Sequence, residues 1–419
     1  MVNLAPHRPR ALLITPIAPA PTGNGLAMRA ALAVEVLTRC WDLWTAVVPV
    51  SDPQIDEDRM QWVSARSVRA VVVDPERPED AVTGWLGDPA ARGVVSSAQP
   101  LPARARSASP AAGVTAKHLL GRDTFDVVWV LRLYLAGTIA SFLGRSRPAQ
   151  LILDSDDDDE ATLSAIADLY ILRGDDPAAN AARAEASTYS CFAAGCLPWF
   201  DQVFAASPID ARALAERHGL DNVATLRNAV SVGPPPAARF SVQEPNLLFV
   251  SNLDYLPNRD AAERLATLLM PAIRKELAGA RLHLVGAGGG IHIEHLGREP
   301  GVTMHGPVDN LTTLYRRADL AVVPLRAGGG SRLKILDAFA NNIPVVATPE
   351  AAAGLDVHDG RELLLASSDE ELVRAVFRVA SDPELSVSLA TGAWHYVSTH
   401  HELDTVAQSL ADRIVGHGC

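Results

Sequence analysis

Short apolar runs recur along the chain between segments with helical periodicity. In the first half these runs lie at residues 11–15, 45–50, 69–74, 126–131, 151–154, 203–206 and 223–226. A second series lies at residues 246–250, 281–285, 302–305, 320–324, 344–347 and 362–365. Buried β-branched strands that alternate with helices are typical of parallel sheets. The pattern therefore predicts an α/β fold built from two such series.

The prolines that separate the two series indicate a linker. Pro234, Pro235 and Pro236 follow one another, and proline continues neither a helix nor a central strand. We expect a first α/β domain at residues 1–232, a linker at 233–245 and a second α/β domain at 246–400. Residues 401–419 are expected to form a terminal helix that packs back towards the first domain. A chain of 419 residues exceeds what one core usually serves, which agrees with two domains.

One stretch of the first half has no clear periodicity. Residues 75–114 are rich in Pro, Ala, Ser and Arg, so we expect a loop or short helices there. The stretch is a candidate for a mobile flap.

Charge and cysteine usage narrow the class of partner. A net charge of −12 argues against nucleic acid and anionic lipid, since both favour an excess of Lys and Arg. The 4 cysteines have no zinc-type spacing, and no apolar run is long enough to span a bilayer. We expect a cytoplasmic protein with small-molecule partners and no integral membrane segment. The oligomeric state stays open, a homo-oligomer included.

The segment from Gly328 to Asp337 carries the strongest candidate chemistry. Three glycines, Gly328, Gly329 and Gly330, precede Ser331 and the start of a predicted helix. Glycines let a backbone approach a ligand, and a helix N-terminus offers free amide donors. Arg332 and Lys334 add two cations, so the segment suits a diphosphate, and the carboxylate of Asp337 suits a ribose diol. The alternative is a plain loop followed by a surface pair of Lys334 and Asp337.

A second glycine-containing turn follows the first predicted strand. Gly23, Asn24 and Gly25 precede a helix that begins near Leu26. Their amides suit a donor phosphate or the mouth of an acceptor site, although an ordinary strand-to-helix turn explains them nearly as well. Arg29 lies one turn into this helix and is expected either at the ligand site or on the surface.

The acidic run at residues 154–160 invites a metal interpretation. Carboxylates at alternate positions suit a hard cation, but the glycine and closing glutamate of a calcium loop are missing. A solvated loop that caps a helix is the simplest alternative. We therefore expect no metal. The glycines after residue 285 lack the spacing and the acidic partner of a dinucleotide fingerprint, so no nicotinamide cofactor is expected either.

Several segments of the second half together carry a resemblance to a known family. They occur in the order and spacing of glycosyltransferase family 4, at residues 249–261, 271–273, 282–286, 305–308, 315–324, 328–338 and 343–348. The chain thus resembles enzymes of the GT-B fold, which have two Rossmann-like α/β domains that face a central cleft. The resemblance is densest in the second half and implies a nucleotide-sugar donor domain there.

The resemblance assigns roles to individual residues. It implies that Arg332 and Lys334 neutralise the leaving diphosphate and act in catalysis. The donor would be held by Gly23, Asn24, Gly25, Ser251, Asn252, Asn258, Gly329, Gly330, Ser331 and Asp337, with backbone at Pro307, Val308 and Leu311 against the base. The acceptor would meet Arg132, Tyr134, Asp154, Asp156 and Asp157.

The chain departs from the family pattern at two places. Residues 251–258 contain neither Arg nor Lys, where many relatives place both, so the positive charge falls to Arg332 and Lys334. The position eight residues before Asp337 is Gly329, where relatives carry the first of two acids. This missing acid leaves the donor sugar undetermined.

The function implied is metal-independent, retaining transfer of a sugar from a nucleoside diphosphate sugar to a small or soluble acceptor, such as a natural-product intermediate. No cofactor is expected beyond the sugar nucleotide. Two alternatives stay open. One is a GT-B relative without sugar transfer, such as a nucleotide-sugar epimerase or a pseudo-glycosyltransferase. The other is a non-catalytic nucleotide-sugar binding protein.

Overall fold

A computed structural model describes most of the chain. The described residues are 8–50, 55–74, 101–108, 110–143, 147–235, 244–290, 293–308, 311–329 and 332–415. They divide into two compact units. Unit 1 comprises Met1–Ala229, Gly329–Ser331 and Leu403–Cys419, and unit 2 comprises Val230–Gly328 and Arg332–Glu402.

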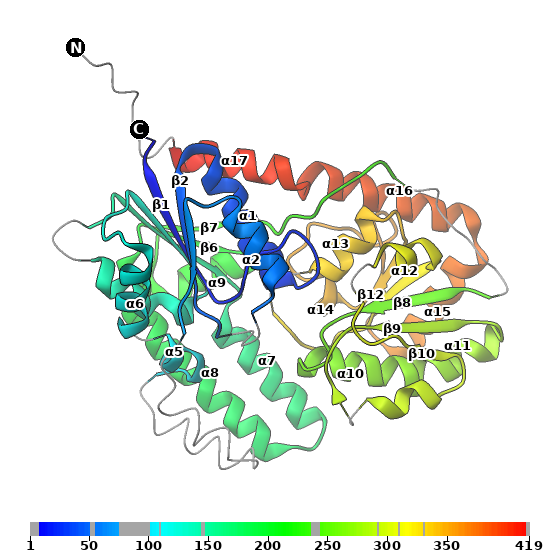
Figure 1. The fold of residues 1–419 in the computed structure, drawn as a ribbon. Coiled ribbons are helices and arrows are strands. Elements are labelled where there is room, and N and C mark those ends of the chain that lie inside the picture. The colour runs from blue at the N-terminus through cyan, green and yellow to red at the C-terminus, as the bar shows by residue number, and fades with distance from the viewer. Residues whose placement is uncertain are drawn as a thin grey trace. The chain divides into compact units, whose positions relative to one another are not determined.

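Unit 1 contains a 7-stranded sheet whose neighbouring strands all run parallel (Figure 1). Its order is β3-β2-β1-β4-β5-β6-β7. The strands are β1 (Arg10–Thr15), β2 (Asp42–Val47), β3 (Arg69–Val72), β4 (Val127–Leu131), β5 (Gln150–Asp156), β6 (Gln202–Ala205) and β7 (Val223–Thr225). The direction of strand addition reverses between β1 and β4, which is the topological switch point of this sheet.

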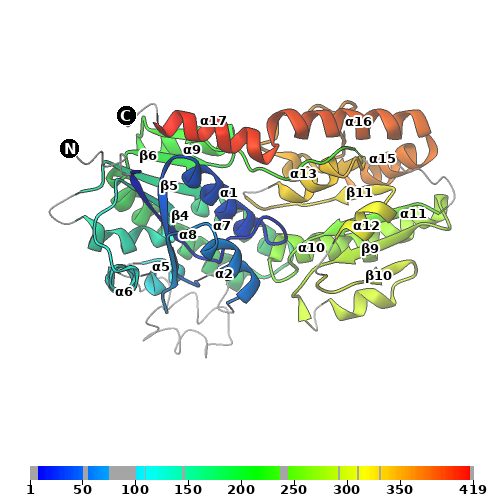
Figure 2. The ribbon, with the colours of Figure 1, turned by 45° about the horizontal axis from the view of Figure 1, so that its top comes forward.

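The helices of unit 1 connect these strands and cover the sheet. They are α1 (Gly25–Cys40), α2 (Glu57–Ser64), α5 (Ala103–Ser107), α6 (Pro110–Leu120), the 3₁₀ segments η1 (Leu133–Phe142) and η2 (Leu197–Trp199), α7 (Asp159–Leu172), α8 (Asp176–Cys196), α9 (Pro208–His218) and α17 (Leu403–Val415). The last helix, α17, lies beside α1 in both ribbon views (Figure 2). Apolar side chains of both helices share one core cluster, in which Leu37 and Ala411 are fully buried.

Unit 2 contains a 6-stranded parallel sheet in the order β10-β9-β8-β11-β12-β13. Its strands are β8 (Asn246–Val250), β9 (Arg281–Val285), β10 (Val302–Met304), β11 (Leu320–Val323), β12 (Val345–Ala347) and β13 (Leu364–Leu365). Its helices are α10 (Leu256–Arg264), η3 (Leu265–Leu269), α11 (Met270–Glu276), η5 (Glu294–Arg298), α12 (Thr312–Arg317), α13 (Leu333–Ala340), α14 (Pro349–Ala352), α15 (Asp369–Ser381) and α16 (Pro383–His400). The switch point of this sheet lies between β8 and β11.

Every strand predicted from the apolar runs is present, which confirms the α/β fold. The largest shift is at β2, which begins at Asp42 and ends at Val47. Pro49 follows shortly after, and proline cannot donate a ladder hydrogen bond. Within the predicted stretch 75–114, residues 101–108 and 110–114 contain α5 and the start of α6, as expected for short helices. The remainder of that stretch, with the candidate flap, lies outside the described residues.

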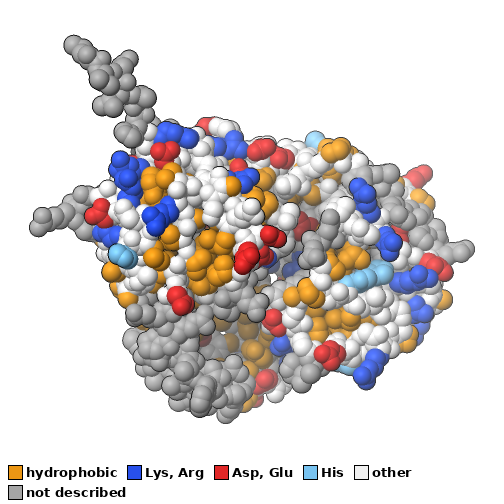
Figure 3. Space-filling view, in the orientation of Figure 1, with side chains coloured by type: hydrophobic (Ala, Val, Ile, Leu, Met, Phe, Trp, Pro, Cys, Tyr) orange, Lys and Arg blue, Asp and Glu red, His pale blue; other side chains and the backbone are white. Residues whose placement is uncertain are grey.

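The outer surface carries charges of both signs. On the face drawn in Figure 3, basic side chains of the described residues occur at several separate places, interspersed with acidic and hydrophobic ones. Among the helices of the described ranges, none combines the length and the apolar character that crossing a bilayer requires.

Candidate functional site

The carboxyl ends of β8 and β11 meet at the switch point of the unit 2 sheet, where ligands of open α/β sheets bind. Helix α13 begins shortly after β11 and turns a polar side towards this edge. Leu336 and Phe339 are fully buried, whereas Lys334 and Asp337 keep partial exposure. This amphipathic arrangement is the one that the helical spacing predicts.

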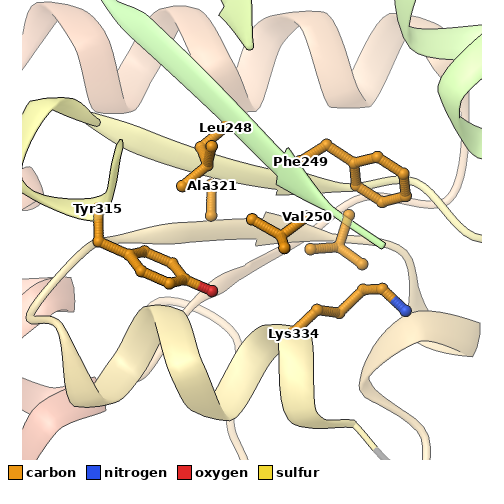
Figure 4. Close-up of a pocket in the computed structure, with 7 residues that line it drawn as sticks. Leu248, Phe249, Val250, Tyr315, Ala321 and Lys334 are labelled. Atoms are coloured by element: carbon orange, nitrogen blue, oxygen red, sulfur yellow. The ribbon is translucent and has the colours of Figure 1, made fainter. Parts of the chain in front are cut away.

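Lys334 lies at the centre of this edge. Its Nζ donates a hydrogen bond of 3.1 Å to Oδ1 of Asn258, at the start of α10. Figure 4 shows its side chain extending from α13 along the strand ends, with the hydroxyl of Tyr315 turned towards the same space. The two side chains line one pocket, together with Leu248, Phe249, Val250, Ala321 and Val323. The pocket is thus lined by one cationic side chain and by apolar side chains of β8 and β11.

Two ionisable groups at this edge have shifted pKa values. Burial, with the neighbouring Arg332, lowers the pKa of Lys334 to about 8. Burial raises the pKa of Asp337 to about 7, although Lys334 opposes that rise. The hydroxyl of Tyr315 is buried and has no hydrogen-bond partner among the described residues. Perturbed pKa values of this kind concentrate at functional sites, because charged groups there are held ready for a ligand.

The loop after β8 is fixed by its backbone. The Ser251 amide donates to the Val285 carbonyl, and a Cβ at Gly286 would lie 1.7 Å from the Ser251 carbonyl oxygen. Only glycine therefore fits at position 286, where φ is 147°. Asn258 Nδ2 donates to the Asn252 carbonyl at 2.7 Å, so the residue that contacts Lys334 also holds this loop. The buried Oγ of Ser251 has no hydrogen-bond partner in the described part of the chain.

Helix α10 also anchors the loop that leads from β11 to α13. Both carboxylate oxygens of the buried Asp260 accept hydrogen bonds from Arg326, at 2.9 and 2.5 Å. Arg264 donates to the Pro324 carbonyl at 2.9 Å. Helix α10 therefore contacts Lys334 at the start of α13 and the part of the loop that follows β11.

Arg332 occupies the N-cap position of α13. Its Nε donates to the Ala353 carbonyl at 2.6 Å and its Nη1 to the Gly328 carbonyl at 3.4 Å. These contacts hold the guanidinium against the backbone of the loop before α13 and of the residue that follows α14. The sequence alone predicted a phosphate ligand for Arg332 and did not anticipate these carbonyl contacts, which depend on α14 folding beside α13.

The other residues predicted for the donor lie around the same edge. Pro307 and Val308 are exposed in the loop after β10, and Leu311 is the N-cap residue of α12. Gly328, with φ at 125°, and Gly329 belong to the loop before α13, while Gly330 and Ser331 lie outside the described residues.

In unit 1, the predicted turn after β1 forms the start of α1. Asn24 is the N-cap residue, and its Oδ1 accepts hydrogen bonds from the amides of Leu26 and Ala27. Gly23 has φ at 93° and is exposed, and Gly25 is the first helical residue. The side chain of Asn24 therefore caps the helix, a role that the residue type favours.

Arg29 is buried in unit 1 and is paired with other protein groups. The sequence predicted either a ligand contact or a surface position, and the structure shows a third arrangement. Its Nε and Nη2 donate to the two oxygens of Asp154, each at 2.8 Å. Its Nη1 donates to the Leu226 carbonyl and to Asn228. Neither Arg29 nor Asp154 has an exposed side chain, and the pair joins α1 to β5. Both carboxylate oxygens of Asp154 are therefore used to bind Arg29, whereas the sequence predicted that Asp154 contacts the acceptor.

The other acceptor candidates gather at the carboxyl ends of β4 and β5. Arg132 follows β4 with φ at 75°, and its guanidinium faces Asp156, Asp157 and Asp159. Asp156 ends β5 with φ at 59°. Tyr134 is fully buried, with the Arg132 guanidinium 5.6 Å from its ring centre. Asp159 was not selected from the sequence, although its place in the first turn of α7 beside Asp156 was a signal for it.

Arginines neutralise much of the acidic run. Asp158 Oδ2 lies 2.6 Å from Arg217 Nη1, and Asp158 also caps α7 by accepting from the Ala161 amide. Within the described ranges, no three His, Cys, Asp or Glu side chains are arranged to hold a metal ion.

The raised pKa of Asp337 gives a stability prediction. A carboxyl group whose pKa rises from 3.8 to about 7 on folding destabilises the fold increasingly as pH passes from about 4 to 7. We expect Asp337→Asn to melt on the order of 5 °C above the wild type at pH 8 and by less than half of that at pH 5. Differential scanning calorimetry at both pH values measures this. A variant that melts lower at pH 8 than at pH 5, relative to the wild type, would contradict the assignment.

Known proteins share sequence and fold with this chain. Residues 244–382, less than half of the chain, match the sequence model of the family described as "Glycosyl transferases group 1". An exopolysaccharide phosphotransferase of Streptomyces coelicolor is 30% identical over 119 residues. That match covers 28% of this chain and only 12% of the length of that protein.

Solved structures match over nearly the whole chain. Sucrose-phosphate synthase from Thermosynechococcus elongatus has a TM-score of 0.68 at 15% identity, covering 97% of this chain and 98% of its own. HepE of Anabaena, solved with UDP and glucose, has a TM-score of 0.63 at 15% identity, covering 97% and 99%. HepE has also been solved with UDP-glucose. The chain therefore has the fold of the GT-B glycosyltransferases, with the matched family segment in unit 2.

Proposed function

We propose that the protein is a glycosyltransferase of the family 4 type, which transfers a sugar from a nucleoside diphosphate sugar with retention of anomeric configuration and without a metal. The observation that carries the proposal is the position of Lys334 at the switch point of the unit 2 sheet. Burial and Arg332 lower its pKa more than the neighbouring Asp337 raises it, so the ammonium is not fully stabilised by the protein's own carboxylate and suits an anionic ligand. The match to the glycosyl transferases group 1 model over residues 244–382 supports the same donor class.

Lys334 would stabilise the departing diphosphate. As the glycosidic bond ionises, negative charge grows on the β-phosphate, and a fixed ammonium binds this state more strongly than the ground state. Asn258 holds Nζ in place at 3.1 Å, so little reorganisation is needed when the charge develops. Arg332 would contribute from its carbonyl-bound position at the start of α13.

The remaining predicted contacts fit the rest of the donor. The carboxylate of Asp337 would accept hydrogen bonds from the ribose diol, which requires its ionised form. The unpartnered Ser251 hydroxyl and the backbone of the fixed loop after β8 would meet the phosphates. The exposed Pro307 and Val308 offer an apolar surface to the base. We expect a small or soluble acceptor and a cytoplasmic location.

A thermal-shift screen against nucleoside diphosphates and their sugars tests this proposal. Ligands that bind the native state raise the melting temperature. We expect one nucleotide class to do so in the wild type at pH 7.5, where Lys334 is mostly charged and Asp337 mostly ionised. The shift should be lost in Lys334→Ala and kept in Lys275→Ala, whose lysine is exposed on α11.

Two outcomes would count against the proposal. If no nucleotide raises the melting temperature, unit 2 does not bind a nucleoside diphosphate. If a nucleotide sugar binds and is converted to its epimer in the absence of any acceptor, the protein is an epimerase rather than a transferase.

A further inference from the structure

Three carboxylates face the Arg132 guanidinium in unit 1, which contacts them through Nη1 and Nη2, while its buried Nε has no hydrogen-bond partner among the described residues. Nη1 of Arg132 lies 3.6 Å from Asp156 Oδ2 and 3.1 Å from Asp157 Oδ2, and Nη2 contacts Asp159 Oδ1. Each of these three carboxylates turns one oxygen towards the same guanidinium. Their acidic neighbours do not share this arrangement, because Asp154 and Asp158 pair with Arg29 and Arg217.

The second oxygen of each carboxylate lacks a donor. Asp156 Oδ1, Asp157 Oδ1 and Asp159 Oδ2 are buried atoms with no hydrogen-bond partner among the described residues. The side chains of Asp156 and Asp159 are only 5% and 8% exposed. Arg29 Nε lies 3.9 Å from Asp156 Oδ1, which is beyond hydrogen-bond distance, and it already donates to Asp154. A buried acceptor without a donor lowers the stability of the folded state, so a ligand that donates hydrogen bonds to these oxygens would be favoured.

The charge balance shows what kind of donor fits. Burial and the neighbouring Asp157 raise the pKa of Asp156 to about 7, although Arg29 and Arg132 oppose the rise. Burial likewise raises the pKa of Asp159, although Arg132 and Arg104 lower it. Besides burial, the neighbouring carboxylate of Asp157 raises both pKa values, so the negative charges of the cluster repel one another even with these arginines present. A hydroxyl would supply one proton and no charge, whereas an ammonium supplies three N–H donors and the missing positive charge.

The cluster also lies at the sheet edge where ligands of this kind of fold bind, and the side chain of Asp157 there is 22% exposed. Arg132 follows β4 directly and Asp156 ends β5, so both lie at the carboxyl edge of the unit 1 sheet. Strand β4 flanks the switch point of that sheet, the usual ligand position in open α/β sheets.

We propose that the carboxylates of Asp156, Asp157 and Asp159, held by Arg132, bind a primary ammonium group of the substrate. The inference rests on the proposed function only in taking this substrate to be the sugar acceptor. It makes the acceptor an amine-bearing small molecule, such as an amino sugar or an aminocyclitol.

A matched pair of probes tests the charge preference. We expect calorimetric titration at pH 7.5 to show that trans-4-aminocyclohexanol binds at least about tenfold more tightly than trans-1,4-cyclohexanediol, the difference of one charge-assisted contact. Asp156→Asn and Asp159→Asn should each abolish this preference. Asparagine tolerates the left-handed backbone that Asp156 adopts, so the first variant is expected to fold. Asp168→Asn is the control, because Asp168 is an acid of α7 whose side chain is 76% exposed.

Three results would overturn the inference. They are equal binding of the diol and the amine, an amine preference that survives in both cluster variants, and a loss of that preference in Asp168→Asn as large as in the cluster variants. A fourth result, tighter binding of Ca²⁺ than of the amine in the same titrations, would assign the cluster to a metal instead. No nucleotide is present in these titrations, so their failure leaves the donor site in unit 2 untouched, and a failed nucleotide screen leaves this result standing.

Discussion

Replacing Lys334 with alanine is expected to lower turnover by about 10²–10³-fold, the usual loss when a preorganised donor to a developing negative charge is removed. The side chain is held by Asn258 and faces the pocket between β8 and β11, so the variant removes a cation without opening the core (Figure 4). Release of nucleoside diphosphate from the nucleotide sugar selected by the thermal screen measures the effect.

Lys275→Ala provides the matched control, since it removes a lysine of the same unit from an exposed position. Circular dichroism of both variants should match the wild type. Because burial lowers the pKa of Lys334, its removal is not expected to destabilise unit 2. Wild-type turnover in Lys334→Ala would remove the residue from the mechanism.

The largest effect on stability is expected at the buried pair of Arg29 and Asp154. Arg29→Met leaves the Asp154 carboxylate buried without its bidentate partner, which typically costs about 3–5 kcal/mol. It also removes the hydrogen bonds to the Leu226 carbonyl and to Asn228, so β5, α1 and the segment after β7 lose a common anchor. Urea denaturation followed by tryptophan fluorescence reports on unit 1, because all tryptophans except Trp394 belong to it.

A surface pair of the same unit serves as the comparison. Arg39 lies 2.9 Å from Asp404, whose side chain is 84% exposed, so Arg39→Ala should cost less than about 1 kcal/mol. In the double variant of Arg29→Met with Asp154→Leu, no buried charge is left unpaired, so much of the lost stability should return. A single variant as stable as the wild type would show that the pair contributes little.

The fold was largely predictable from the sequence because buried parallel strands read as continuous apolar runs. The runs at 246–250 and 281–285 coincide with β8 and β9. The ends of individual strands were less predictable. The apolar run at 45–50 continues past the end of β2 at Val47, so the strand was predicted too far along the chain. The return of α17 to unit 1 depends on apolar contacts with α1, whose partners are hundreds of residues away in the chain.

The candidate sites were predictable only in part. The spacing of the glycines, Lys334 and Asp337 predicted a loop followed by a helix with one polar face, and the structure has both; the anion ligand stays a prediction. The sequence could not show that Asn24 caps its own helix, or that Arg29 lies buried against Asp154. Such pairings depend on which strands become neighbours. Tyr315 was missed because a buried aromatic near a strand ordinarily belongs to the core, and only its unpartnered hydroxyl distinguishes it.

The most direct measurement of the central claim is a calorimetric titration of the selected nucleoside diphosphate and its monophosphate. If Lys334 binds the β-phosphate, the wild type should bind the diphosphate at least about tenfold more tightly. This difference should shrink in Lys334→Ala and persist in Lys275→Ala. Equal affinities for the two nucleotides in the wild type, or a difference unchanged in Lys334→Ala, would contradict the account.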